Sequence, residues 1–308
     1  MTMSTLLSRG ASALLAIALG IWFEPALAED AKPASQTAAD EQLYVEALQA
    51  LHPAAEKGDA DAQFELGLLY DQGHGVPIDP IQAAIWFKKA AEQGHAGAQH
   101  ALGTYYELGK GLPQDNALAM QWYDAAAKQG DARALRNLGN FYLEGKGVAV
   151  DHARAATLFQ EAADKGNFRA LKNLGYMYYF GAGVPKDVTK AAALFRVAAG
   201  GDEASAQFAL GSLYYVGDDV PRDLAKAFEL LRRSAEQGYA KGQLLLGRMY
   251  ARGEGVETNP GEAWFWLIVA EAQEPVLARH YMKEFADQVG EAARRDAEAR
   301  AGLWMPRD

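Results

Sequence analysis

Glycine recurs at one fixed interval through most of this 308-residue chain. Six glycines follow one another at steps of 36 residues: Gly67, Gly103, Gly139, Gly175, Gly211 and Gly247. A single compact core does not require such a period, whereas stacked copies of one supersecondary unit produce it directly. The sequence therefore predicts a repeat array. Because arrays usually act through a long surface, we look for a binding stripe before a catalytic pocket.

The residues around each of these key glycines predict a helix, which we call helix A. A leucine precedes every key glycine and a tyrosine follows three residues later, as in Leu66 and Tyr70. With the small residue four positions before the leucine, these residues share one helical face. Glycine inside a helix costs about 1 kcal/mol relative to alanine. We therefore expect a neighbouring helix to approach closely there, and a second glycine six residues later to cap the helix.

A loop and a second helix, helix B, complete each unit. An Asp or Asn stands where helix B should begin: Asp79, Asp115, Asp151, Asp187, Asp223 and Asn259. These side chains are expected to cap the helix, with Pro80 and Pro260 at the first helical position and Gln82 and Glu262 completing capping boxes. Ala83, Trp86 and Ala90 predict the buried face of helix B. Asp202 replaces a turn glycine, which predicts a turn shifted by a residue or two.

The ends of the chain differ from the array. Residues 1–28 resemble a cleaved signal peptide, with Arg9, an apolar stretch and Ala26-Leu27-Ala28 before the cleavage site; an uncleaved anchor is the alternative. Residues 29–40 are expected to be a flexible leader. Residues 41–58 predict an N-terminal capping helix kinked at Pro53. The repeats start near 59, 95, 131, 167, 203 and 239 within 41–275, and residues 276–308 form a C-terminal capping helix and tail.

Composition and motifs argue against most catalytic classes. The net charge of −10 opposes binding to nucleic acid, and the absence of cysteine excludes disulfides and thiolate chemistry. The chain contains none of the serine-hydrolase, β-lactamase or zinc-protease motifs. His74, His95 and His100 form the one loose histidine cluster, and surface histidines are the favoured interpretation. We expect no enzyme activity, no metal, no cofactor and no membrane span after signal cleavage.

The repeated pattern, clearest over residues 59–94, resembles the Sel1-like repeat, a relative of the tetratricopeptide repeat. This resemblance covers residues 41–275. It implies an all-α, right-handed superhelical solenoid of six 36-residue helix pairs with capping helices. It also implies a scaffold role, and exported relatives act in envelope assembly, polysaccharide export and signalling. Some secreted relatives carry a disulfide in each unit and are linked to β-lactam hydrolysis, but this chain lacks those cysteines.

A binding surface is expected in the columns of helix A that vary between repeats. We define the helix A stripe as the residues three before, one after and four after each key glycine, and expect it to face outward along the concave surface. The predicted groove is centred on the third to fifth units: Arg136, Asn137, Asn140, Lys172, Asn173, Tyr176, Tyr179 and Tyr215. Arg and Tyr concentrate binding energy in interfaces. The alternative is that these residues only fill a curved core.

Three functions remain open from the sequence. The first is a periplasmic or secreted adaptor that binds a protein or peptide. The second is an envelope module that binds carbohydrate or peptidoglycan, with Tyr176, Tyr179 and Tyr215 stacked on sugar rings. The third is a hydrolase of cell-wall or β-lactam substrates. Binding of a peptide carboxylate by Arg136 and Lys172 should weaken with salt, whereas ring stacking should not.

Overall fold

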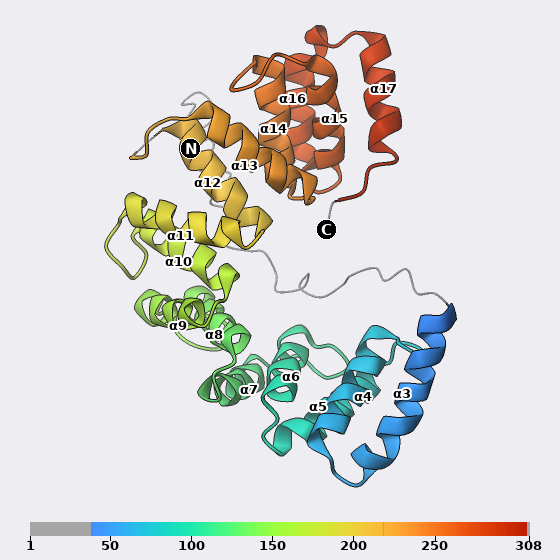
Figure 1. The fold of residues 1–308 in the computed structure, drawn as a ribbon. Helices are drawn as coiled ribbons and strands as arrows, with labels where there is room; N and C mark the ends of the chain where they lie inside the picture. The colour runs from blue at the N-terminus through green and yellow to red at the C-terminus, as the bar shows by residue number, and fades with distance from the viewer. Residues whose placement is uncertain (1–37, 218, 307–308) are drawn as a thin grey trace. The chain divides into compact units, whose positions relative to one another are not determined.

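A computed structural model describes residues 38–217 and 219–306. The predicted signal peptide, and the predicted leader up to residue 37, lie outside the described residues. The described chain consists of fifteen α-helices and one short 3-10 helix, and these residues contain no strand. The predicted all-α fold of stacked helix pairs is confirmed (Figure 1).

The helices repeat with the predicted period. The A helices are α4 (Ala60–Gln72), α6 (Ala96–Leu108), α8 (Ala132–Glu144), α10 (Phe168–Phe180), α12 (Ala204–Val216) and α14 (Ala240–Arg252). The B helices are α5 (Pro80–Glu92), α7 (Asn116–Lys128), α9 (His152–Asp164), α11 (Val188–Gly200), α13 (Leu224–Glu236) and α15 (Pro260–Glu271). The array is preceded by α3 (Ala38–Glu56), which includes Pro53, so residues 38–40 of the predicted leader are helical. It is followed by α16 (Pro275–Phe285), η3 (Ala286–Gln288) and α17 (Glu291–Ala301).

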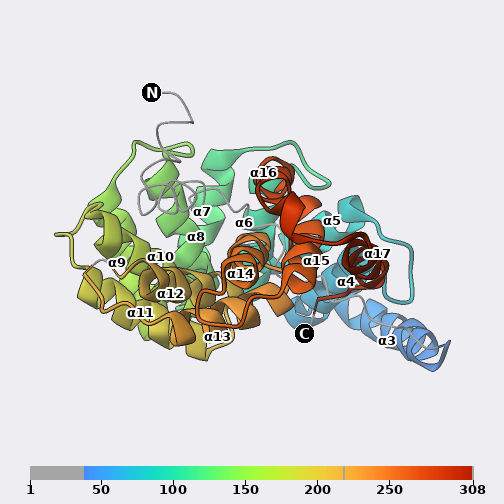
Figure 2. The ribbon, with the colours of Figure 1, turned by 90° about the horizontal axis from the view of Figure 1, so that it is seen from above.

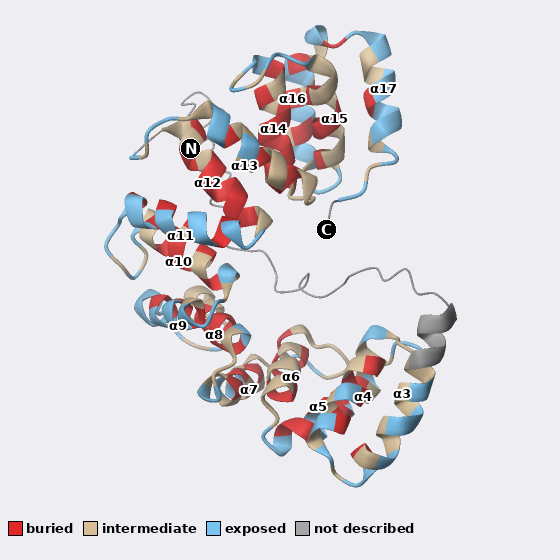
Figure 3. Cartoon of the chain, viewed as in Figure 1, coloured by how far each residue is buried: buried red, intermediate tan, exposed pale blue. Residues whose placement is uncertain are grey.

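The chain divides into two compact units, which we describe separately. The first unit contains the described residues up to 170 together with 182–184, and the second contains 171–181 and the described residues from 185 onward. In the first unit each helix from α3 to α9 packs on the next (Figure 2). In the second unit the same holds from α11 to α16, and α17 packs on α15. Buried residues concentrate where neighbouring helices meet (Figure 3).

The key glycines lie against the following helix B, as the sequence predicts. A Cβ atom on Gly67 would lie 2.5 Å from the ring of Phe87, and one on Gly139 would lie 2.5 Å from the ring of Phe159. Such distances are shorter than real Cβ contacts, so only glycine leaves room for the ring. In each repeat the side chain that contacts the key glycine is the helix B residue that follows the position of Trp86. These residues are Phe87, Tyr123, Phe159, Phe195, Leu231 and Leu267.

We expect Gly139→Ala to lower the free energy of unfolding by about 1 kcal/mol. Overpacking against the fully buried Phe159 costs about 1–3 kcal/mol, and the gain in helix propensity offsets about 1 kcal/mol. Phe159→Leu should remove part of the clash, since a Cβ atom on Gly211 would lie 2.9 Å from Leu231, a wider but still short distance. Urea unfolding of the two single variants and the double variant measures this coupling.

The control is Gly200→Ala in α11, where an added Cβ would meet no atom within 4 Å. This variant should keep or slightly raise the free energy of unfolding. An equal increase for Gly139→Ala would show that the key glycines are not required for close packing.

The predicted caps of helix B are confirmed, but the predicted capping boxes are not formed. The side chain of Asp79 accepts hydrogen bonds from the backbone N–H groups of Ile81 and Gln82, both at 3.0 Å. The backbone N–H of Asp79 donates to the carbonyl of Tyr70 at 2.9 Å, where a capping box would use the Gln82 side chain. The same bond to the repeat tyrosine recurs at every described helix B start, including Asn259. The loop is therefore closed by backbone atoms.

The turn before α12 keeps the register of the other repeats, so the predicted shift at Asp202 is wrong. Helices α11 and α12 begin 36 residues after α9 and α10. Asp202 adopts the left-handed conformation with φ of 57°, which aspartate tolerates better than most residues. Its carboxylate also contacts Arg233 at 2.5 Å. Asp202 therefore adopts the left-handed conformation that glycine adopts in the other repeats, and the register is unchanged.

Candidate binding surface

The helix A stripe lies where successive A helices contact one another. No stripe residue is fully exposed; each is half-buried or buried. Arg136, Lys172, Tyr176 and Tyr215 are all less than a tenth exposed. The expectation that these columns face outward is therefore wrong for the buried members, such as Tyr176, whose ring packs against Phe195 of α11. Whether these residues bind a partner stays a prediction.

In the first unit, two predicted site residues join a histidine on the preceding A helix. The Arg136 guanidinium donates from Nη2 to Asn137 Oδ1 at 2.8 Å. Asn137 Nδ2 in turn lies 3.3 Å from His100 Nε2. These contacts connect α8 to α6, while Asn140, one turn further along α8, is half-buried. Arg136, Asn137 and His100 thus form one polar layer between two helices.

The electrostatics of this layer keep His100 neutral near pH 7. Burial lowers the pKa of the His100 imidazole to about 4, and the positive charges of Arg133 and Arg136 act in the same direction. Burial opposes ionisation of Asp131, yet the hydrogen bond from the Ala134 N–H holds its pKa below the ordinary value. A neutral His100 imidazole can form a hydrogen bond with Asn137, and it does not add a third positive charge beside Arg133 and Arg136.

A second polar group in the first unit surrounds Glu107, which is buried. Tyr123 donates its hydroxyl to Glu107 Oε2 at 2.7 Å, and Lys146 Nζ lies 3.1 Å from Glu107 Oε1. Burial opposes the charge of Lys146, but the carboxylates of Glu144 and Glu107 raise its pKa. Burial raises the pKa of Tyr123 well above its ordinary value. Both oxygens of the Glu107 carboxylate are therefore bound by side chains of this chain.

In the second unit, the predicted tyrosines on α10 belong to an aromatic cluster. Tyr176 meets Phe195 edge to face, with ring centroids 4.8 Å apart. Tyr179 meets Phe180 in the same way at 4.9 Å. On the same helix Asn173 is half-buried, and Lys172 Nζ lies 3.7 Å from Glu203 Oε1. The α10 part of the stripe is thus apolar and aromatic, with one buried cation.

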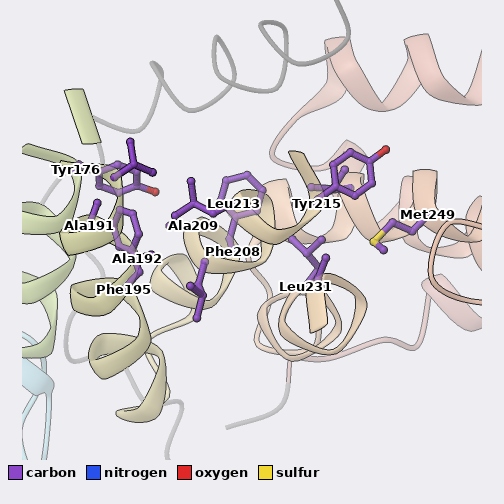
Figure 4. Close-up of a cluster of buried hydrophobic side chains, with 14 residues drawn as sticks. Tyr176, Ala191, Ala192, Phe195, Phe208, Ala209, Leu213, Tyr215, Leu231 and Met249 are labelled. Carbon is purple, nitrogen blue, oxygen red and sulfur yellow. The ribbon is translucent and has the colours of Figure 1, made fainter. Parts of the chain in front are cut away.

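Tyr215 lies at the edge of a cluster that extends from α10 to α14. Figure 4 shows its ring beyond Leu213 and Phe208, with the hydroxyl directed away from both. The hydroxyl donates to Glu254 Oε2 at 2.5 Å, and burial with this bond raises the pKa of Tyr215 to about 12. The Arg248 guanidinium carbon lies 5.7 Å from the ring centroid.

The predicted site residues therefore fall into separate groups. Arg136 and Asn137 are brought together in the first unit, whereas Lys172, Tyr176 and Tyr215 belong to the second. Sequence reasoning missed His100 and Arg248 as participants, although both stand in the stripe. Arg248 carried a usable signal, because a cation replaces the small, polar or aromatic residues found at its column in most other repeats.

A cleft of about 530 Å³ in the first unit is lined by residues of α7, α8 and α9. Its floor includes Leu135, Leu138 and Leu158, and Asp124 and Lys128 pair at 2.5 Å on its rim. Among residues 38–217 and 219–306, no three His, Asp or Glu side chains are arranged to hold a metal ion. No described helix has the length and apolar character needed to cross a membrane.

The fold defines a solenoid built from helix-pair repeats. The family model for the Sel1 repeat matches residues 60–95, 96–131, 132–167, 169–201, 204–239 and 240–274. These matches cover most of the chain, and the chain therefore belongs to the Sel1 repeat family. The resemblance inferred from the glycine, leucine and tyrosine columns is confirmed.

Solved structures of Sel1 repeat proteins are similar to this chain. A Sel1 repeat protein from Oxalobacter formigenes is 33% identical with a TM-score of 0.70, over 74% of this chain and 92% of that one. A putative Sel1 repeat protein from Klebsiella pneumoniae is 26% identical with a TM-score of 0.46, over 66% and 99% of the two chains. No curated protein matches the sequence.

Proposed function

We propose that this chain is a non-enzymatic adaptor that binds a protein or peptide along the helix A stripe. The supporting observation is that the stripe changes in chemistry from repeat to repeat while the stacking columns beneath it stay constant. Within it, His100, Thr104 and Glu107 are followed by Arg136, Asn140 and Leu143 one repeat later. Packing of identical repeats does not require the stripe residues to differ from one repeat to the next. Binding of one partner along the stripe does require different side chains in different repeats.

The proposed surface includes the eight residues predicted from the sequence: Arg136, Asn137, Asn140, Lys172, Asn173, Tyr176, Tyr179 and Tyr215. The buried members position the half-buried ones, and the half-buried Asn140, Asn173 and Tyr179 are the ones a partner can reach. Export to the periplasm or beyond, through cleavage after Ala28, and a role in the cell envelope complete the proposal. They are supported by the sequence of residues 1–28 and by the resemblance to exported relatives.

Site-specific photo-crosslinking tests the proposal. A photo-reactive residue at Tyr179 should form an adduct with one protein partner in cells, whereas the same residue at Val197, which is 55% exposed on helix B, should not. Combining Asn140→Ala with Tyr179→Ala should reduce recovery of that partner at least tenfold while helicity stays unchanged. Equal adducts at Tyr179 and Val197, or unchanged recovery by the double variant, would contradict the proposal.

The carbohydrate alternative receives less support from the stripe geometry. Sugar binding by stacking needs a free aromatic face, but Arg248 lies over the ring of Tyr215 and Phe195 contacts Tyr176. Tyr179 alone of the three predicted tyrosines is not buried. An adduct at Tyr179 that resists protease and is removed by a glycan hydrolase would favour the carbohydrate alternative.

A further inference from the structure

Arg248 occupies a defined position between aromatic rings in the second unit. It follows the key glycine of α14, so it belongs to the helix A stripe. Its guanidinium carbon lies 5.7 Å from the ring centroid of Tyr215 on α12 and 6.0 Å from that of Tyr281 on α16. Contacts with ring faces restrict the arginine while leaving its charge in place.

The guanidinium of Arg248 has no carboxylate partner among the described residues. No Asp or Glu of residues 38–217 and 219–306 forms an ion pair with it, and its Nε is buried without a hydrogen-bond partner. One turn further along α14, Arg252 is paired with Glu284 at 2.6 Å. Because a half-buried cation without a counter-ion is costly, the unpaired state of Arg248 calls for an explanation.

The neighbouring groups supply neither a counter-charge nor an acceptor. The carboxylate of Glu254 accepts the hydroxyl of Tyr215, which stays neutral at ordinary pH. At the equivalent stripe position one repeat earlier, the buried hydroxyl of Ser212 also has no hydrogen-bond partner. Arg248 Nε and Ser212 Oγ are therefore two buried polar atoms on successive A helices that have no hydrogen-bond partner among the described residues, whereas Glu107 in the first unit is paired with Tyr123 and Lys146.

We propose that Arg248 anchors the carboxylate of an Asp or Glu side chain in a bound peptide segment of a partner protein. The inference rests on the proposed function and names the chemistry of its ligand. A carboxylate is the group that a guanidinium binds with two parallel hydrogen bonds, and it restores charge balance at a half-buried site. Tyr215 and Tyr281 both lie next to Arg248, on α12 and α16. A bound peptide that crosses these helices continues past Arg248 in both directions. The carboxylate at Arg248 is therefore expected to come from a side chain within the peptide and not from its C-terminus.

Peptide selection provides the test. Random dodecapeptides displayed on phage through their C-terminal ends are selected on the purified protein, so no free terminal carboxylate is offered. The recovered peptides should share one Asp or Glu at a fixed position. A fluorescent, C-terminally amidated copy should bind Arg248→Gln at least tenfold more weakly, a loss of about 1.4 kcal/mol. Changing the acidic residue of the peptide to its amide should weaken binding equally, and the two losses should not add.

Arg252→Gln is the matched control, because it removes a cation from the same helix that already has a partner in Glu284. It should change affinity less than threefold, and thermal unfolding should show all variants folded. Peptides that bind Arg248→Gln as well as the unmodified protein would overturn the anchor while leaving the adaptor function intact. Failure to recover any binding peptide would contradict both. If a copy of the peptide with a free C-terminus and with its acidic residue changed to the amide binds as tightly as the original, the side-chain assignment is overturned.

Discussion

Gly111→Ala is expected to lower the free energy of unfolding by about 3 kcal/mol or more. Gly111 lies in the loop after α6 with φ of 64°, a conformation that costs alanine about 1–2 kcal/mol. A Cβ atom there would lie 2.2 Å from the carbonyl oxygen of Pro80, at the start of α5. Since backbone cannot move aside as a side-chain end can, separating the loop from α5 adds a further 1–3 kcal/mol.

Gly94→Ala separates the two contributions. Gly94 has φ of 92°, but an added Cβ would meet no atom within 4 Å. This variant should therefore lose only the conformational part, about 1–2 kcal/mol. Urea unfolding followed by circular dichroism measures both variants. Equal losses at Gly111 and Gly94 would show that the loop does not pack tightly on the preceding helix B.

Acid is expected to destabilise the protein through His100. The ordinary pKa of 6.5 applies to the unfolded chain, and burial together with Arg133 lowers the folded value to about 4. Between these values the unfolded chain binds a proton that the folded chain excludes. The free energy of unfolding is therefore unaffected by His100 above pH 6.5 and falls as pH decreases toward 4. The total loss is at most about 3 kcal/mol, at 1.36 kcal/mol for each unit of pKa.

His100→Gln tests this assignment because glutamine is polar and does not titrate. The unmodified protein should lose stability between pH 6.5 and pH 4, and the variant should lose less over the same interval. Urea unfolding at half-unit steps of pH provides the comparison. A parallel pH dependence in His100→Gln would show that other groups control acid destabilisation.

Much of the fold could be predicted from the sequence because the same local rules repeat six times. The glycine that ends each A helix adopts a positive φ, and the Asp and Asn caps form as their chemistry requires. The capping-box prediction failed because two acceptors were available to the same backbone N–H group. The N–H of Asp79 binds the carbonyl of Tyr70, and the side chain of Gln82 is not needed. Asp202 also adopts the conformation that its column demands.

The candidate site was less accessible to sequence reasoning. Periodicity assigns a residue to a face of its helix, but it does not show how far the next helix covers that face. Glu107 was placed in the stripe, yet its ion pair and hydrogen bond depend on Lys146, 39 positions away, and on Tyr123 of the facing helix. That no Asp or Glu of the described residues pairs with Arg248 also depends on the positions of all neighbouring carboxylates.

The sequence by itself determined the repeat length, the caps of helix B and the need for glycine at each close approach. These features depend on backbone conformation and on residues within one unit, so short-range rules decide them. Only the tertiary structure decided which side chain fills the space at each glycine and which polar groups of the stripe pair internally. Those outcomes depend on distances between helices, because burial and charge pairing are set by every neighbour of a side chain in space.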